Sequence, residues 1–224
     1  GAATRTLRAL SVVLNYAVER GYLMANPTVG VKKTPDSKCE RFLSVPELER
    51  LGQALDRSEG QRDPRGLSII RLLALTGCRR REIEGLRWDE VDLERGFLRL
   101  KDSKTGAKVV FLSRAAAALL ARVTVMAGSP WVFPATTGTS HYQNASKIWR
   151  EVRALAKLEG VRLHDLRHTY ASQSLSEGAS LEVVAALLGH KERRTTERYA
   201  HLASDPIKEA ANRVGSAIEL AMRG

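Results

Sequence analysis

Apolar side chains recur at steps of three and four residues along most of the chain, which is the period of amphipathic helices. The first such segment covers residues 5–20 and is closed by Gly21. Another begins at Ser44, which forms the pattern of a capping box with Glu47, and continues to a polar loop at 57–63. Further helices are predicted at 65–76, 114–126, 140–156 and 163–177, and from about Asp205.

Two short segments lack the helical period. Residues 97–100 and 109–112 are predicted to be strands, and the glycine-containing stretch between them, 101–108, is typical of a hairpin loop. In the helix predicted at 140–156, apolar residues that include Val152 and Leu155 are expected to face the core. The resulting fold class is mainly α with a small antiparallel β-sheet.

Residues 28–41 contain glycine, proline and basic residues without periodicity, which is the composition of a linker. We therefore divide the chain into a first segment at 1–30, a linker at 31–41 and a main domain at 42–224. Because the first residue is Gly rather than Met and a helix begins almost at once, we expect the chain to be a piece of a longer protein.

Charge and cysteine content narrow the possible partners. Lys and Arg number 36 against 25 Asp and Glu, a formal charge of +11, which favours a polyanionic partner such as nucleic acid. A solvated basic surface is the alternative, and charge alone does not decide between them. Cys39 and Cys78 are too few for a disulfide framework and indicate a reducing cytoplasm. With no signal-peptide pattern and no apolar run of about 18 residues, no membrane partner is expected.

Candidate chemistry gathers between residues 163 and 201. In L-H-D-L-R-H, His164 and Arg167 are three residues apart and share a helical face, where an imidazole and a guanidinium together suit a phosphate oxyanion. His190 follows a helix-ending glycine in L-L-G-H, and Tyr199 lies nine residues later in T-T-E-R-Y-A-H. Phosphate-directed groups followed by a phenol suggest a nucleophile aimed at a phosphodiester.

Other interpretations of these residues stay open. His164 and His168 have the spacing of a zinc pair, but a fixed cation at Arg167 on the same face would repel the metal. His168 is interpreted as a packed helix residue. Tyr199 considered by itself would more often be a half-buried packing residue.

The pattern H-x-x-R, then L-G-H, then a Tyr after T-T-x-R resembles the tyrosine recombinases, the phage integrase family, over residues 42–204. The resemblance selects Arg79 from the three arginines of T-G-C-R-R-R-E, with Glu82 holding its guanidinium. It selects Lys104 in the K-T-G hairpin, with Lys101 and Lys108 as open alternatives. The catalytic set it implies is Arg79, Lys104, His164, Arg167, His190 and Tyr199.

The resemblance also implies an activity and an assembly. The expected enzyme is a site-specific DNA recombinase or integrase that uses a 3′-phosphotyrosyl intermediate and needs no cofactor and no metal. Its expected partners are a double-stranded recombination site and a homotetramer assembled on that DNA. Residues 1–30 would be the last part of a helical core-binding domain, and 42–224 the integrase catalytic domain.

Two other function classes compete with this one. A type IB topoisomerase shares the phosphotyrosine chemistry on a similar fold, although L-G-H and T-T-x-R-Y are more typical of integrases. A catalytically silent DNA-binding module would lack the nucleophile. The apolar stripe that follows Asp205 is expected to pack either on its own domain or on a neighbouring protomer.

Overall fold

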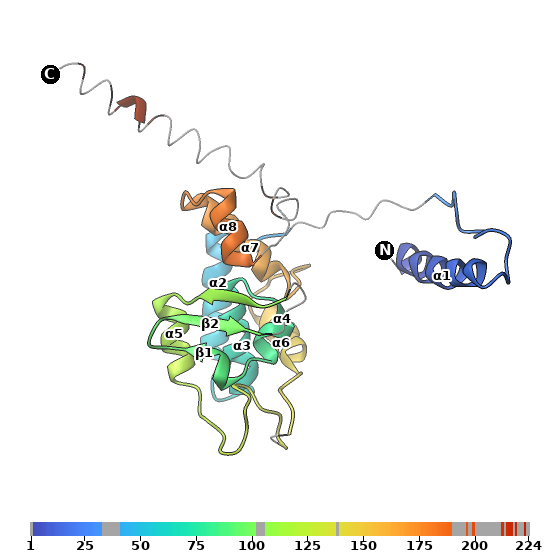
Figure 1. Ribbon diagram of the computed structural model, residues 1–224. Helices are drawn as coiled ribbons and strands as arrows, with labels where there is room; N and C mark the ends of the chain where they lie inside the picture. Colours follow the sequence, from blue (N-terminus) through green and yellow to red (C-terminus); the bar gives the residue numbers. More distant parts are fainter. Residues whose placement is uncertain are drawn as a thin grey trace. The chain divides into compact units, whose positions relative to one another are not determined.

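The computed structural model describes residues 2–32, 41–101, 106–137, 139–189, 196 and 199, with isolated positions between 212 and 222. The chain divides into two compact units, Gly1–Glu40 and Arg41–Gly224. Among the described residues, none of the helices has the length and apolar character that crossing a membrane requires. As predicted, the structure is mainly helical with one small antiparallel sheet (Figure 1).

In the first unit, the described residues 2–32 form one helix, α1 (Ala2–Glu19), close to the predicted range. After the turn at Gly21, the chain folds back and Asn26 is bonded to the helix, because its amide donates to the main-chain carbonyl of Ser11 at 3.1 Å. The carbonyl oxygen of the same amide accepts the N–H of Thr28 at 2.9 Å. Several apolar side chains of α1 are exposed, including Val12 and Val13.

In the second unit, α3 (Pro64–Thr76) packs against α5 (Arg114–Ala121), α6 (Ala145–Leu155) and α7 (Asp165–Ser176). Local signals set both ends of α3. At its start the Asp63 carboxylate accepts the N–H of Arg65 at 3.0 Å and Pro64 fills the first turn. At its end Gly77 takes the left-handed conformation, with φ of 62°.

Helix α2 (Val45–Arg57) packs on α6 and starts as predicted at Ser44. The Glu47 carboxylate accepts the backbone N–H of Ser44 at 3.0 Å, which supplies the glutamate half of a capping box. The shorter elements are α4 (Arg80–Glu84), the 3₁₀ turn η1 (Trp88–Glu90) and α8 (Leu181–Leu188). Figure 1 shows α7 and α8 side by side, in agreement with their packing contacts.

The sheet has three antiparallel strands in the order β1 (Val91–Asp92), β2 (Phe97–Leu100) and β3 (Lys108–Phe111). Strand β1 is only two residues long and was not predicted. Leu98 pairs with Val110 and both are buried in the main core, so this face of the sheet packs inward. Leu100 pairs with Lys108, and β3 therefore begins one residue before the predicted strand.

Three predicted helices are shorter than expected. Helix α7 covers Asp165–Ser176 rather than 163–177, and His164 is its N-cap residue. Helix α5 ends at Ala121 rather than 126. The β-branched residues 123–125 follow shortly after it, and β-branched side chains disfavour a helix. Helix α6 begins at Ala145 rather than 140, because a bridge between Pro134 and His141 holds the preceding residues. The prediction for Leu155 is wrong, since its side chain is 49% exposed.

The stripe predicted from Asp205 lies almost wholly outside the described residues. Its described members Val214 and Ile218 are helical and are 58% and 55% exposed.

Candidate active site

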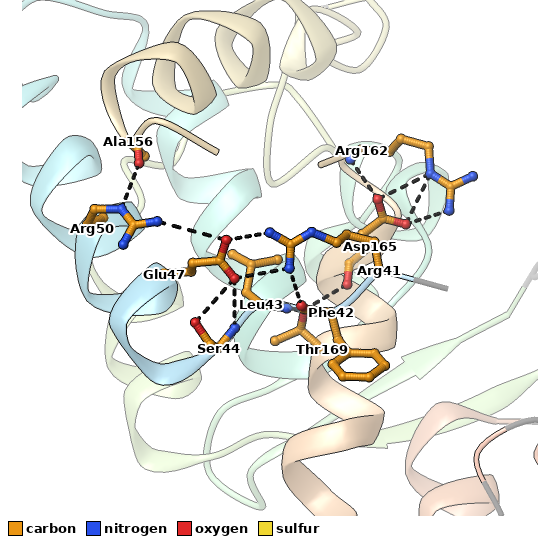
Figure 2. A network of polar contacts seen from close by, with 10 residues as sticks. All are labelled: Arg41, Phe42, Leu43, Ser44, Glu47, Arg50, Ala156, Arg162, Asp165 and Thr169. Atoms are coloured by element: carbon orange, nitrogen blue, oxygen red, sulfur yellow. Dashed lines mark hydrogen bonds and ion pairs between the residues drawn. The ribbon is translucent and has the colours of Figure 1, made fainter. Parts of the chain in front are cut away.

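The first turn of α7 is fixed by buried polar contacts (Figure 2). The Asp165 carboxylate, which is fully buried, accepts the N–H of Arg162 at 2.7 Å and its guanidinium at 2.6 Å. The Thr169 hydroxyl donates to the Asp165 carbonyl and accepts the N–H of Leu43, both at 2.9 Å. The bond from Leu43 joins the first residues of the second unit to α7. Together these contacts fix the backbone that carries His164 and Arg167.

Arg167 is buried and joins the ends of two helices. Its Nη1 donates to the carbonyl of Gly77 at 2.6 Å, and its Nη2 donates to the carbonyl of Leu188 at 3.0 Å. These carbonyls lie at the C-terminal ends of α3 and α8, where the helix dipole is negative and favours a cation. The guanidinium is therefore held in one orientation by main-chain atoms.

The glycines of T-G-C-R and L-G-H are needed at these positions for the same structural reason. Gly77 and Gly189 are left-handed caps, with φ of 62° and 65°. A Cβ on Gly77 would lie 2.6 Å from Cδ1 of Tyr170, and one on Gly189 would lie 2.6 Å from Cδ of Lys108. Both caps therefore allow close approach of the chains around Arg167.

Arg79 is the arginine of the R-R-R run that Glu82 holds, as predicted. Its N–H donates to Oε2 of Glu82 at 2.8 Å and its Nη1 donates to Oε1 at 2.9 Å. Arg80 instead donates to Ser146, and Arg81 is exposed. Burial lowers the pKa of Arg167, and the nearby positive charge of Arg79 lowers it further.

The hairpin lysines have different surroundings. Lys101 is 64% exposed and pairs with Asp89 at 2.6 Å. The side chain of Lys108 is only 7% exposed, and its Nζ lies 2.8 Å from Oε2 of Glu82. Lys104, the predicted proton donor, lies outside the described residues, as does His190, so their roles stay predictions.

Tyr199 lies against α7 and α8. It is 3% exposed, packs in a cluster with Ala171 and Leu188, and its N–H donates to the carbonyl of Thr196 at 2.9 Å. Its hydroxyl is 2.7 Å from Nδ1 of His168. His168 is packed, as the sequence suggested, but it also contacts the predicted nucleophile.

His164 is held at the start of α7, and its ring meets that of His168 edge-on with centroids 5.2 Å apart. Burial lowers the pKa of His164, and the Arg167 charge lowers it further. The imidazole is therefore neutral near pH 7 and can accept a proton. No three histidine, cysteine or acidic side chains within the described parts of the chain are grouped to hold a metal.

The sequence did not reveal the structural roles of Asp165 and Thr169. It also did not reveal that His168 contacts Tyr199 or that Lys108 contacts Glu82. The spacing of His168 from His164 was visible, because residues four apart share a helical face. The strand register that turns Lys108 toward Glu82 was not visible in the sequence.

The amino-acid sequence is similar to those of known protein families and individual proteins. The model of the phage integrase family matches residues 41–205. The chain belongs to this family. It is 30% identical to the tyrosine recombinase XerD of Brucella suis biovar 1 (strain 1330), covering 91% of this chain and 72% of that protein. It is 30% identical to the tyrosine recombinase XerC of Xylella fastidiosa (strain M23), covering 88% and 69%.

Solved structures show the same fold. The XerA recombinase matches with a TM-score of 0.61 at 25% identity, covering 94% of this chain and 75% of that chain. A dimer of lambda integrase residues 75–356 bound to a core site matches with a TM-score of 0.68 at 20% identity, covering 85% of this chain and 72% of that chain. The protein is thus a tyrosine recombinase, an enzyme that breaks and rejoins DNA, and these matches favour it over a topoisomerase or a silent binding module.

Proposed function

We propose that this recombinase cleaves each DNA strand by attack of Tyr199 on a phosphodiester, forming a 3′-phosphotyrosyl bond. The observation that carries the proposal is the position of the Tyr199 hydroxyl, which is buried 2.7 Å from Nδ1 of His168, the residue whose ring contacts that of His164. A phenol has an ordinary pKa of about 10, so it becomes a useful nucleophile only beside positive charge and a base. In this proposal Arg79 and Arg167 supply the positive charge, and His164 is the base.

The arginines bind and polarise the phosphate. Arg79 and Arg167 donate to its two non-bridging oxygens and stabilise the charge of the pentacoordinate transition state. Because Glu82 holds Arg79 and two carbonyls hold Arg167, little reorganisation is needed at the moment of reaction. His190 adds a hydrogen bond to the same phosphate.

Two proton transfers complete the cleavage. His164 takes the proton of Tyr199 as the O–P bond forms, and Lys104 gives a proton to the 5′-oxygen as its bond to phosphorus breaks. The Tyr199 hydroxyl must turn away from His168 for this attack, since it is buried there. Attack by the 5′-hydroxyl of a different strand reverses these steps and rejoins the DNA.

Exchange between two duplexes requires four cleavages, which a homotetramer assembled on a double-stranded recombination site supplies with one Tyr199 in each protomer. Residues 1–30 act as the last part of a core-binding domain, 31–41 as the linker and 42–224 as the catalytic domain, including the C-terminal helix. The protein works in the cytoplasm, without a cofactor.

Trapping the intermediate tests the proposal. A library of nicked duplexes with randomised sequence is incubated with the protein, so that the fragment beyond the nick diffuses away after cleavage and leaves the covalent adduct. Adducts that survive detergent are isolated, and the attached peptide is identified by mass spectrometry. We expect a peptide containing Tyr199 with a 3′-linked nucleotide, and enrichment of one duplex sequence. An adduct at another residue, or no adduct, would contradict the proposal.

The pH dependence of cleavage should report His164. As pH falls through the lowered pKa of His164, its imidazole becomes protonated and cannot take the phenol proton. We expect the second-order rate constant of cleavage at subsaturating duplex, which reports the DNA-free protein, to fall on the acid side with a midpoint below 6.5, the ordinary histidine value. His164→Ala should remove this limb and lower the plateau. A midpoint above 6.5, or a limb unchanged in the variant, would exclude His164 as the base.

Cleavage should not depend on a divalent ion, because the arginines supply the charge stabilisation that a metal provides in a nuclease. Adduct yield and rate on the enriched duplex are measured in EDTA and in magnesium, and we expect equal values. Activity that is lost in EDTA and restored by magnesium or zinc would count against the proposed mechanism.

A further inference from the structure

Lys108 is the first residue of β3 and directly follows the hairpin loop that carries Lys104. Its Nζ lies 2.8 Å from Oε2 of Glu82, and the two side chains are only 7% and 4% exposed. The pair of Lys108 with Glu82 is buried, whereas the pair of Lys101 with Asp89 lies at the surface. Removing one partner of a buried pair is strongly destabilising, because the remaining charge has neither a partner nor solvent.

The same carboxylate holds Arg79. Oε2 of Glu82 accepts the Arg79 N–H at 2.8 Å, and Oε1 accepts its Nη1 at 2.9 Å. Burial raises the pKa of Glu82, but the hydrogen bond and charge of Lys108, together with the bonds from Arg79, outweigh it and leave the pKa below its ordinary value. Lys108 therefore helps to keep Glu82 ionised and its two oxygens fixed.

The aliphatic part of Lys108 meets the other arginine anchor. Its Cδ would be 2.6 Å from a Cβ at Gly189, so the lysine stem runs directly under this turn. The preceding carbonyl, that of Leu188, accepts Nη2 of Arg167 at 3.0 Å. A single side chain from β3 thus contacts the support of Arg79 and the support of Arg167.

We infer that Lys108 is a positioning residue for cleavage: its ammonium orients Glu82, and through it Arg79, while its stem supports the Gly189 turn behind Arg167. This inference rests on the proposed function of both arginines at the scissile phosphate. Lys108 is not the proton donor to the leaving oxygen, because its ammonium is engaged by a buried carboxylate.

The first measurement compares Lys108→Met with Lys101→Met, a matched change at the exposed end of the same hairpin. Single-turnover cleavage of the enriched duplex is followed at saturating DNA, beside the dissociation constant and the melting temperature. We expect Lys108→Met to slow cleavage by about 10- to 100-fold, the scale of a small misplacement of a catalytic group. Its DNA affinity should change little, and Lys101→Met should cleave at the wild-type rate. A wild-type rate for Lys108→Met would overturn the inference.

A double-mutant cycle tests whether Lys108 acts through Glu82. We expect Glu82→Gln and Lys108→Met each to slow cleavage and the double variant to be little slower than the worse single variant. The double variant also removes the unpaired carboxylate, which restores a folded protein if Lys108→Met alone is unstable. Multiplicative losses would show that Lys108 acts independently of Glu82, contrary to the inference.

A duplex with sulfur in place of the bridging 5′-oxygen separates positioning from proton donation, since a thiolate leaves without being protonated. Lys108→Met should stay slow on this duplex, whereas Lys104→Met should regain the wild-type rate. Recovery of Lys108→Met would make Lys108 the proton donor and overturn the inference. If the wild-type protein forms no adduct on either duplex, the proposed function itself has failed, which is a distinguishable result.

Discussion

Tyr199→Phe is expected to abolish the covalent adduct with DNA while duplex binding is retained. The phenylalanine ring can still pack in the cluster with Ala171 and Leu188, so the fold should survive. The lost hydrogen bond to Nδ1 of His168 should cost about 1 kcal/mol, and more if the imidazole is left unpaired. Because the phenol oxygen itself forms the bond to phosphorus, its removal should eliminate the adduct completely and not merely partially.

Tyr170→Phe is the matched control, because Tyr170 is a half-buried tyrosine on α7 that packs against Gly77. This variant should form the adduct as the wild type does. Adduct yield on the nicked duplex is measured together with the dissociation constant and the melting temperature. Adduct that persists in Tyr199→Phe and is lost in Tyr170→Phe would transfer the nucleophile to α7 and refute the proposed mechanism.

Local signals made the helix α3 predictable and left others imprecise. Asp63, Pro64 and Gly77 mark its ends within the sequence, and its observed range differs from the prediction by one residue. The start of α6 depends instead on the bridge between Pro134 and His141, a contact that periodicity does not contain. Helix ends set by local caps are readable from sequence, whereas ends set by tertiary contacts are not.

The same distinction applies to the site. The contact of Arg79 with Glu82 spans three residues and was predicted from the motif. The partners of Arg167 are 90 and 21 residues away, at Gly77 and Leu188, and Lys108 is 26 residues from Glu82. Charge and spacing could show that Arg167 suits a phosphate, but only the assembled helix ends show why it points in one direction.

Arg79→Ala and Arg167→Ala should each slow single-turnover cleavage by about 10²- to 10³-fold, the range for losing one donor to transition-state charge. Their effects on stability should differ. Arg167→Ala leaves the buried carbonyls of Gly77 and Leu188 without its N–H groups, at about 1–3 kcal/mol for each unpaired acceptor. Arg79 is 23% exposed and its partner Glu82 keeps Lys108, so Arg79→Ala should lower the melting temperature less.

Lysine at either position separates charge from geometry. A lysine keeps the positive charge but has no planar fork, so Arg79→Lys and Arg167→Lys should bind DNA nearly as tightly as the wild type and still cleave slowly. The rate constant at saturating duplex is compared with the dissociation constant for all four variants, each below its own melting temperature. If a guanidinium contacts only the ground-state phosphate, its removal will weaken binding and leave the rate constant unchanged. That result at Arg167 would be the more damaging, because the helix ends of α3 and α8 would then hold a binding group rather than a catalytic one.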